Sequence, residues 1–161
     1  MRFTLLRLVL IVAALTALLA VAVPFYVRSR AARLDARCAD NLSQLWKMSY
    51  GYKAQFGSPN KLFPANTGGD FWLCLTRTPV PLVDGVSHPI FSCPAAPAHA
   101  ALGTTHYRGP ATDVNARPER DAVGACLHTG DALIVLFGTN NVMQVPAGSP
   151  DAQAALRATR P

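Results

Sequence analysis

The fold is decided by residues 8–27, which read LVLIVAALTALLAVAVPFYV and contain no charged side chain. A helix that crosses a bilayer needs about 20 mainly apolar residues, so this stretch is long enough. Its Leu, Ile, Val and Phe side chains favour membrane insertion by very roughly 4–7 kcal/mol. Arg7 lies at one end, where its side chain can reach the interface, and Phe25 and Tyr26 suit the opposite interface. We therefore predict that residues 1–27 hold a single membrane-spanning helix segment in contact with the lipid bilayer.

A cleaved signal peptide is the alternative interpretation of this stretch. Arg2 and Arg7 would form its basic region, residues 8–19 its apolar region, and Ala20-Val21-Ala22 its cleavage site. The mature protein would then be secreted and soluble. We favour the anchor because the residues that follow continue the helix, which a cleaved peptide does not explain.

Residues 28–56 are predicted to form the second half of the same helix. Apolar or small side chains recur there every three or four residues, which is the spacing of one helix face. Gly57-Ser58-Pro59-Asn60 ends the pattern. One helix is expected from about residue 3 to residue 56, bent at Pro24 because proline has no N–H to donate. The predicted core-facing positions are Leu34, Cys38, Leu42, Leu45, Ser49, Tyr52 and Phe56.

The remaining residues, 57–161, are predicted to form a loop-rich head with short strands. Most of the 13 prolines and 11 glycines lie there. The fold class is therefore α+β, with the long helix packed on a small antiparallel sheet, and residues 28–161 form one domain. The expected elements are a strand or short helix at 70–75, a strand at 88–94, a hairpin of strands 131–137 and 142–145 on the helix, and a short helix at 151–158.

Charge and motif content exclude several function classes. The net charge is +6, and the head carries no long basic stripe, so we expect no nucleic-acid partner. No nucleophile–base pair or phosphate-binding loop is visible, so we expect neither an enzyme nor a cofactor. Arginines follow the apolar run and are expected to face lipid headgroups; they are Arg28, Arg30, Arg33 and Arg37.

The chain has four cysteines, Cys38, Cys74, Cys93 and Cys126. An oxidising compartment would convert an even set in a small domain into two disulfides, for which three connectivities are open. A zinc site is the alternative, but no CxxC or HxxxH spacing supports it; the available histidines are His88, His99, His106 and His128. The spacing of Asp113, Asp121 and Asp131 does not match a calcium loop.

Several short motifs occur in a particular order along the chain. They are the opening Phe3-Thr4-Leu5-Leu6, Pro24, the segment from Arg37 to Leu45, Tyr52, Phe63-Pro64, Phe91-Ser92-Cys93-Pro94, Tyr107-Arg108-Gly109-Pro110, His128-Thr129-Gly130, Leu133 to Phe137, and Val142. Taken together, their order resembles that of type IV pilins and type II secretion pseudopilins with a prepilin-type N-terminus.

The resemblance implies a structural subunit of the bacterial inner membrane whose head is periplasmic, or extracellular in a filament. Such a subunit packs against other pilin-like subunits through its N-terminal helix, in a homo- or hetero-oligomer. Relatives often carry one helix cysteine and one Cys-Pro cysteine. The resemblance therefore favours a Cys38–Cys93 disulfide, which leaves Cys74–Cys126 as the second.

Two positions depart from the family pattern. Prepilin processing needs a glycine directly before the phenylalanine, and Arg2 stands there before Phe3. The family's acidic residue four positions after the phenylalanine is Arg7, which would bring like charges together in a low dielectric. A positive-inside count over the arginines after residue 27 would also place the head in the cytoplasm. The alternative function is therefore a membrane-tethered periplasmic binding module that does not polymerise.

Overall fold

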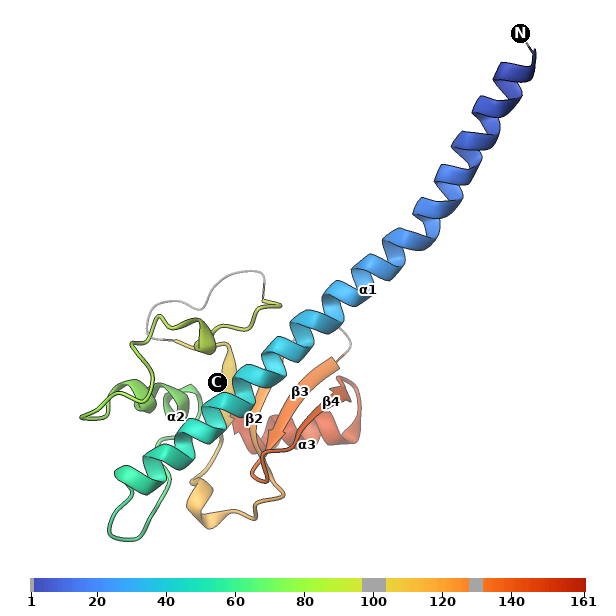
Figure 1. Cartoon of the computed structure of the whole chain (residues 1–161). Helices are drawn as coiled ribbons and strands as arrows, with labels where there is room; N and C mark the ends of the chain where they lie inside the picture. The colour runs from blue at the N-terminus through green and yellow to red at the C-terminus, as the bar shows by residue number, and fades with distance from the viewer. Residues whose placement is uncertain (1, 97–103, 128–131) are drawn as a thin grey trace. The chain divides into compact units, whose positions relative to one another are not determined.

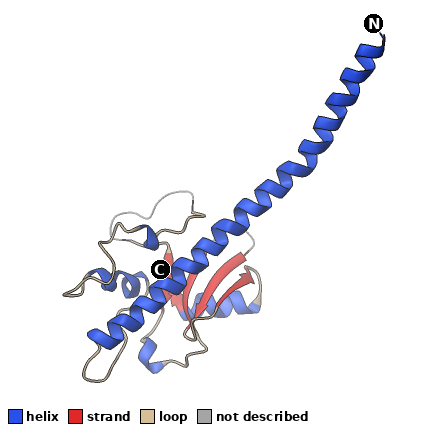
Figure 2. Ribbon diagram, viewed as in Figure 1, coloured by secondary structure: helices blue, strands red, loops and turns tan. Residues whose placement is uncertain are grey.

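The computed structural model describes residues 2–96, 104–127 and 132–161, with side chains described from Arg7 onward. The chain consists of two compact units, Met1–Leu34 and Asp35–Pro161. Helix α1, Arg2–Gln55, is continuous and contains Pro24 (Figures 1 and 2). The predicted long N-terminal helix is therefore confirmed.

Helix α1 ends at Gln55, and the backbone turns away from the helix at Phe56 and Gly57. Both of their N–H groups donate to the carbonyl of Tyr52, at 2.8 Å and 3.2 Å. A Cβ at Gly57 would overlap the carbonyls of Lys53 and Leu62, so the chain can turn this tightly only with glycine.

The second unit is built on a five-stranded antiparallel sheet with the strand order β4-β3-β2-β1-β5. Its strands are β1 (Tyr107–Pro110), β2 (Ala122–Leu127), β3 (Ala132–Phe137), β4 (Val142–Pro146) and β5 (Thr159–Arg160). The other elements are α2 (Gly69–Leu73), α3 (Pro150–Ala158) and the 3-10 helices η1 (Cys74–Thr76), η2 (Pro89–Phe91) and η3 (Val114–Ala116). The α+β class with a helix packed on a sheet is thus confirmed.

Local predictions in the head had different outcomes. The hairpin is confirmed as β3 and β4, with Asn140 at a positive φ in the turn, and the C-terminal helix is confirmed as α3. The strand expected at residues 88–94 is wrong, because Pro89 begins a 3-10 turn there that the His88 ring caps. Residues 70–75, left open between strand and helix, are helical.

The central strands are buried on both faces, because helices cover both. Ile134 and Leu136 of β3 pack into the cluster that contains Leu42 and Leu45 of α1. Leu133 and Val135 alternate with them and pack on the other face in a second cluster with Ala152 and Ala155 of α3. The head is therefore three layers deep, with the sheet between α1 and α3 (Figure 1).

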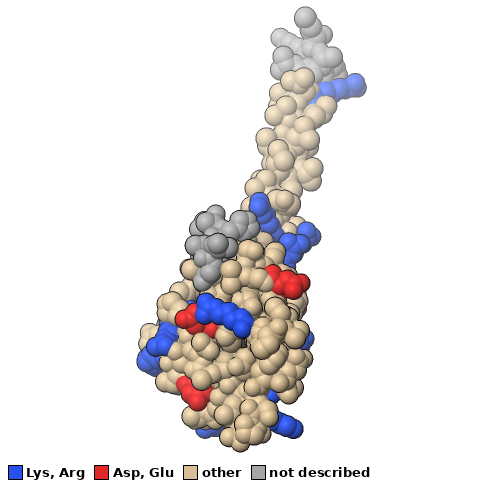
Figure 3. All heavy atoms as spheres, turned by 90° about the vertical axis from the view of Figure 1, so that its left-hand side faces the viewer, with Lys and Arg blue, Asp and Glu red and all other residues tan. Residues whose placement is uncertain are grey.

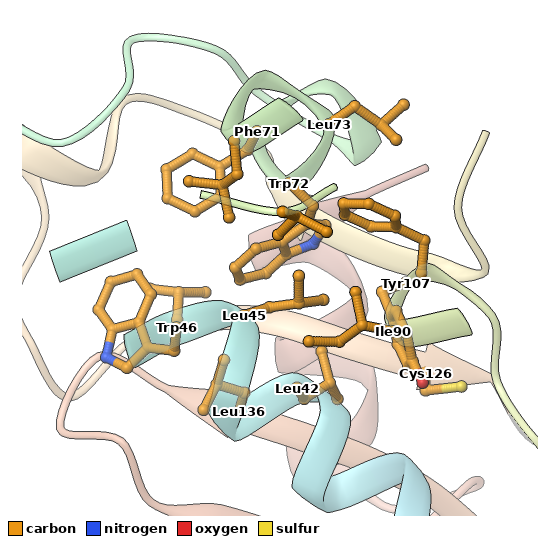
Figure 4. Close-up of a cluster of buried hydrophobic side chains, with 14 of the residues drawn as sticks. Leu42, Leu45, Trp46, Phe71, Trp72, Leu73, Ile90, Tyr107, Cys126 and Leu136 are labelled. Atoms are coloured by element: carbon orange, nitrogen blue, oxygen red, sulfur yellow. The ribbon is translucent and has the colours of Figure 1, made fainter. Parts of the chain in front are cut away.

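The face of α1 that enters the core contains most of the predicted positions. Cys38, Leu42, Leu45 and Ser49 are buried, and Leu34, Tyr52 and Phe56 are half-buried. Trp46 is also buried, although the predicted stripe did not include it. Its indole N–H donates to the carbonyl of Gly138 at 3.0 Å, and its ring stacks on Phe63 with 5.0 Å between centroids. Figure 4 shows Leu42, Leu45 and Trp46 among the aromatic side chains of α2.

Helix α2 is held against β1 by a close backbone approach. The N–H of Gly68 donates to the carbonyl of Pro110 at 2.8 Å, and the Trp72 indole N–H donates to the carbonyl of Arg108 at 3.1 Å. A Cβ at Gly109 would overlap the carbonyl of Gly68, so a side chain there would push the two segments apart. This contact places Phe71 and Trp72 in the core beside α1.

Leu42→Ala is expected to destabilise the head by about 2–5 kcal/mol, because Leu42 is 0% exposed and its removal leaves a cavity. The measurement is urea unfolding of the full chain in detergent micelles, followed by the fluorescence of Trp46 and Trp72. Gln44→Ala, two residues away on the exposed face, is the matched control and should change the unfolding free energy by no more than about 0.5 kcal/mol. Equal stability of the two variants would contradict the packing of α1 on the sheet.

Candidate functional site

The N-terminal part of α1 presents an uninterrupted apolar surface. Every side chain from Leu8 to Val27 is exposed, and Leu18 and Phe25 are 65% and 75% exposed. Thr16 is polar, but its hydroxyl donates back to the carbonyls of Val12 and Ala13 at 3.0 Å and 2.9 Å, so it needs no water. On the face that Figure 3 shows, no Lys, Arg, Asp or Glu atom lies along this segment. We call residues 8–27 the apolar segment.

The apolar segment is long and apolar enough to cross a membrane. None of its most apolar window is buried within the structure, so the segment is not a core helix of the head. A signal sequence would satisfy the same length and composition. Exposed arginines stand at both ends, Arg7 before the segment and Arg28 and Arg30 after it.

The predicted processing and assembly positions all lie in α1. Arg2 and Phe3 are in its first turn, and their side chains lie outside the described part of the structure. Arg7 is exposed. Pro24 lies inside the helix and has no N–H to donate to the carbonyl four residues earlier, that of Ala20.

Three cysteines converge in the core of the head. Cys38 comes from α1, Cys93 follows η2, and Cys126 comes from β2. Their Sγ atoms all lie within 4.8 Å of one another, and those of Cys38 and Cys93 are 3.0 Å apart. Their exposed fractions are 0%, 4% and 1%. We call these three residues the thiol cluster.

Hydrogen bonds fix the loop that carries Cys93 against α1 and β1. Asn41, three residues after Cys38, donates its side-chain N–H to the Tyr107 hydroxyl at 3.1 Å and to the carbonyl of Ser92 at 3.4 Å. The Tyr107 hydroxyl donates to the same carbonyl at 3.3 Å and accepts from Cys38 Sγ at 3.6 Å. The thiol cluster is therefore bordered by a compact set of polar groups.

Burial and hydrogen bonds keep the thiols of Cys38 and Cys126 protonated. A hydrogen bond with Cys126 lowers the pKa of Cys38, but a hydrogen bond with Cys93 and burial outweigh it and raise the value to about 12. Hydrogen bonds with Cys38 and Cys93, together with burial, raise the pKa of Cys126. Burial also raises the pKa of the Tyr107 hydroxyl. These groups are therefore neutral at pH 7.

The two predicted disulfides are not present in the structure, where all four cysteines are thiols. Cys38 and Cys93 lie in contact without a bond. Cys126 belongs with them rather than with Cys74, because its place on β2 faces α1. The Cys74 thiol instead donates to the carbonyl of Phe71 at 3.0 Å, in the turn between α2 and η1.

Histidine side chains in the described part of the chain do not join the thiol cluster. The Nδ1 atom of His106 accepts from the backbone N–H of Cys93 at 3.1 Å, and that of His88 accepts from the N–H of Ile90 at 3.2 Å. His99 and His128 lie outside the described residues.

The aspartates considered for calcium have separate structural contacts. Asp113 accepts from the backbone N–H of Asn115 at 3.0 Å and caps η3. Asp121 pairs with Arg117 at 3.8 Å. Asp131 lies outside the described residues.

An open cavity of about 570 Å³ reaches Cys93, one member of the thiol cluster, from the surface. One wall is the polar side of α1, including Arg37 and Asn41, and the other is the segment from His88 to Ala96, including Cys93. Sequence reasoning missed this cavity, because its walls come from residues 37–44 and 88–96, which no local pattern joins.

No protein-family model, no curated protein and no solved structure matches this chain. The arrangement of a long apolar N-terminal helix followed by a small antiparallel sheet is compatible with pilin-like architecture.

Cys74 is expected to react with iodoacetamide at pH 8 about 1,000-fold more slowly in the folded protein than in guanidinium chloride. Burial raises the pKa of this thiol from 9.0 to about 12, and only the thiolate reacts. The rate is measured by mass spectrometry of the peptide that contains Cys74. Equal rates in the two states would contradict its burial.

The same shift has a consequence for stability. Because the folded-state pKa of Cys74 lies above the unfolded one, its contribution to stability is fully present below about pH 9. It is lost as the pH rises towards 12.

Proposed function

We propose that this protein is a membrane-anchored structural subunit of pilin type. The apolar segment holds it in the inner membrane of a bacterium, and the head lies outside the cytoplasm. The observation that carries the proposal is the apolar segment itself, whose 20 residues expose their side chains and leave no charge to solvate. Water is a poor solvent for such a surface, and acyl chains or neighbouring apolar helices are good ones.

Association with other subunits is proposed to run along one face of the apolar segment. Helices in lipid associate through close packing, which small side chains permit. Ala13, Ala17 and Ala20 follow one another at intervals of four and three residues, so they lie on the same face of α1. This kind of association requires no catalytic residue and no cofactor.

The second candidate function is a membrane-tethered binding module that does not polymerise. The open cavity of about 570 Å³ favours it, since a structural subunit has no need of such a site. Arg7 favours it too, because its charge is costly to place among packed helices in lipid. The two candidates share the anchor and differ in whether helices associate.

Leu15→Asp is expected to lower the membrane-bound fraction, because a carboxylate in the middle of the apolar segment opposes insertion by about 3 kcal/mol and so offsets about half of the favourable free energy. The measurement is carbonate extraction of membranes followed by immunoblotting. Val80→Asp, at an apolar position that is 65% exposed in the head, is the control and should leave fractionation unchanged. A membrane-bound fraction of Leu15→Asp equal to that of the wild type would contradict the anchor.

The intact mass of the wild-type chain in the same membranes separates the remaining interpretations. Retention of residues 8–27 is expected, with or without loss of Met1-Arg2. Removal of the chain through Ala22 would identify a signal peptide and rule out the anchor.

Ala17→Phe is expected to reduce cross-linking between subunits in membranes by about tenfold, because a bulky ring prevents close helix approach. Leu18→Phe places the same ring on a different face and should leave cross-linking near the wild-type level. Both variants should remain in the membrane fraction. Absence of cross-links in the wild type, together with absence of filaments in negative-stain images, would favour the tethered module.

A further inference from the structure

We propose that the thiol cluster of Cys38, Cys93 and Cys126 is a binding site for the soft metal ion Cu(I). The three residues lie in the head and not in the apolar segment, and the site requires their thiols to stay reduced where the head lies.

The geometry of the thiol cluster suits one ion bound between three sulfurs. At a metal–sulfur distance of about 2.3 Å, three sulfurs in a plane around an ion lie about 4 Å apart. The Sγ atoms here all lie within 4.8 Å of one another. The Sγ atoms of Cys38 and Cys93 are 3.0 Å apart, so this distance has to increase by about 1 Å when the ion binds. Small side-chain rotations can supply that change.

The donor set favours Cu(I) over Zn(II). Soft thiolate ligands select Cu(I) and zinc among the common metals, and structural zinc takes four ligands. In the described residues no histidine or carboxylate completes the cluster. The Tyr107 hydroxyl is 3.6 Å from Cys38 Sγ, but it already accepts from Asn41 and donates to Ser92. Three thiolates complete the coordination of Cu(I), whereas zinc needs a fourth ligand, such as water, in addition to them.

The surroundings of the thiol cluster fit a site that is loaded from solvent. Cys93 lines the open cavity, so an ion can reach one ligand without unfolding the core. Each thiol that binds the ion loses its proton to solvent, and the sulfur electron pair forms the metal bond. The single positive charge of Cu(I) offsets one of the three thiolate charges, and the side-chain amide of Asn41 and the hydroxyl of Tyr107 border the negative charge that remains. No oxidant or reductant is needed, because copper enters and stays as Cu(I).

The test is a competition titration of the reduced full chain in detergent micelles under anaerobic conditions. Cu(I) is supplied as its complex with a coloured chelator, whose absorbance reports transfer to the protein. One equivalent of Cu(I) per chain is expected, and Cys126→Ser should weaken binding by at least about 100-fold. Cys74→Ser is the matched control, since Cys74 is also buried but lies outside the thiol cluster, and it should bind as the wild type does.

Three results would overturn the proposal. One is a wild-type chain that takes no Cu(I) from the chelator or binds only Zn(II). Another is a loss in Cys74→Ser as large as that in Cys126→Ser. The last is a disulfide between any two clustered cysteines in protein isolated with its thiols blocked by alkylation. Near-ultraviolet circular dichroism checks that each variant is folded, and Cys126→Ala replaces Cys126→Ser if the serine variant is not.

Discussion

Burial of Leu42, Leu45 and Trp46 against the sheet is the interaction on which the rest of the head depends. Without it, α1 would expose a second apolar face, and β3 would lose the cover over Ile134 and Leu136. The helix has one continuous backbone but two different surroundings along its length. Its first part buries none of its most apolar window, whereas its last turns are part of a protein core. One continuous helix thus has an exposed apolar part and a part that is packed in a protein core.

The thiol cluster and the cavity both follow from that packing. Cys38 lies one helical turn before Leu42 on the same face of α1, so docking the helix carries its thiol into the core. Cys126 alternates with Ala125 on β2 and therefore faces α1 rather than α3. The segment that carries Cys93 then closes over the helix through Asn41. These residues are far apart in the chain and come together because α1 packs on the sheet. Their contact could therefore not be predicted from sequence spacing.

The parts of the fold that could be predicted are those with local signals. The helix period, the apolar run and the turn at Gly138 to Asn141 are contained in short windows, and the structure has α1, β3 and β4 there. Trp46 was missed because a single stripe of three- and four-residue steps is narrower than the face that is buried. Residues 88–94 were misjudged because their apolar content outweighed the two prolines in the prediction. The pairing of β1 with β2 and β5 joins distant segments, so it required the structure.

The edge strands of the sheet, β4 and β5, restrict how copies of the head can associate. Strand β4 ends on Pro146, which has no N–H to offer a neighbour, and β5 has only two residues before Pro161. Neither edge strand offers a strand of another molecule a long row of unpaired backbone N–H and C=O groups. Growth of the sheet by edge-to-edge pairing between copies of the head is therefore disfavoured.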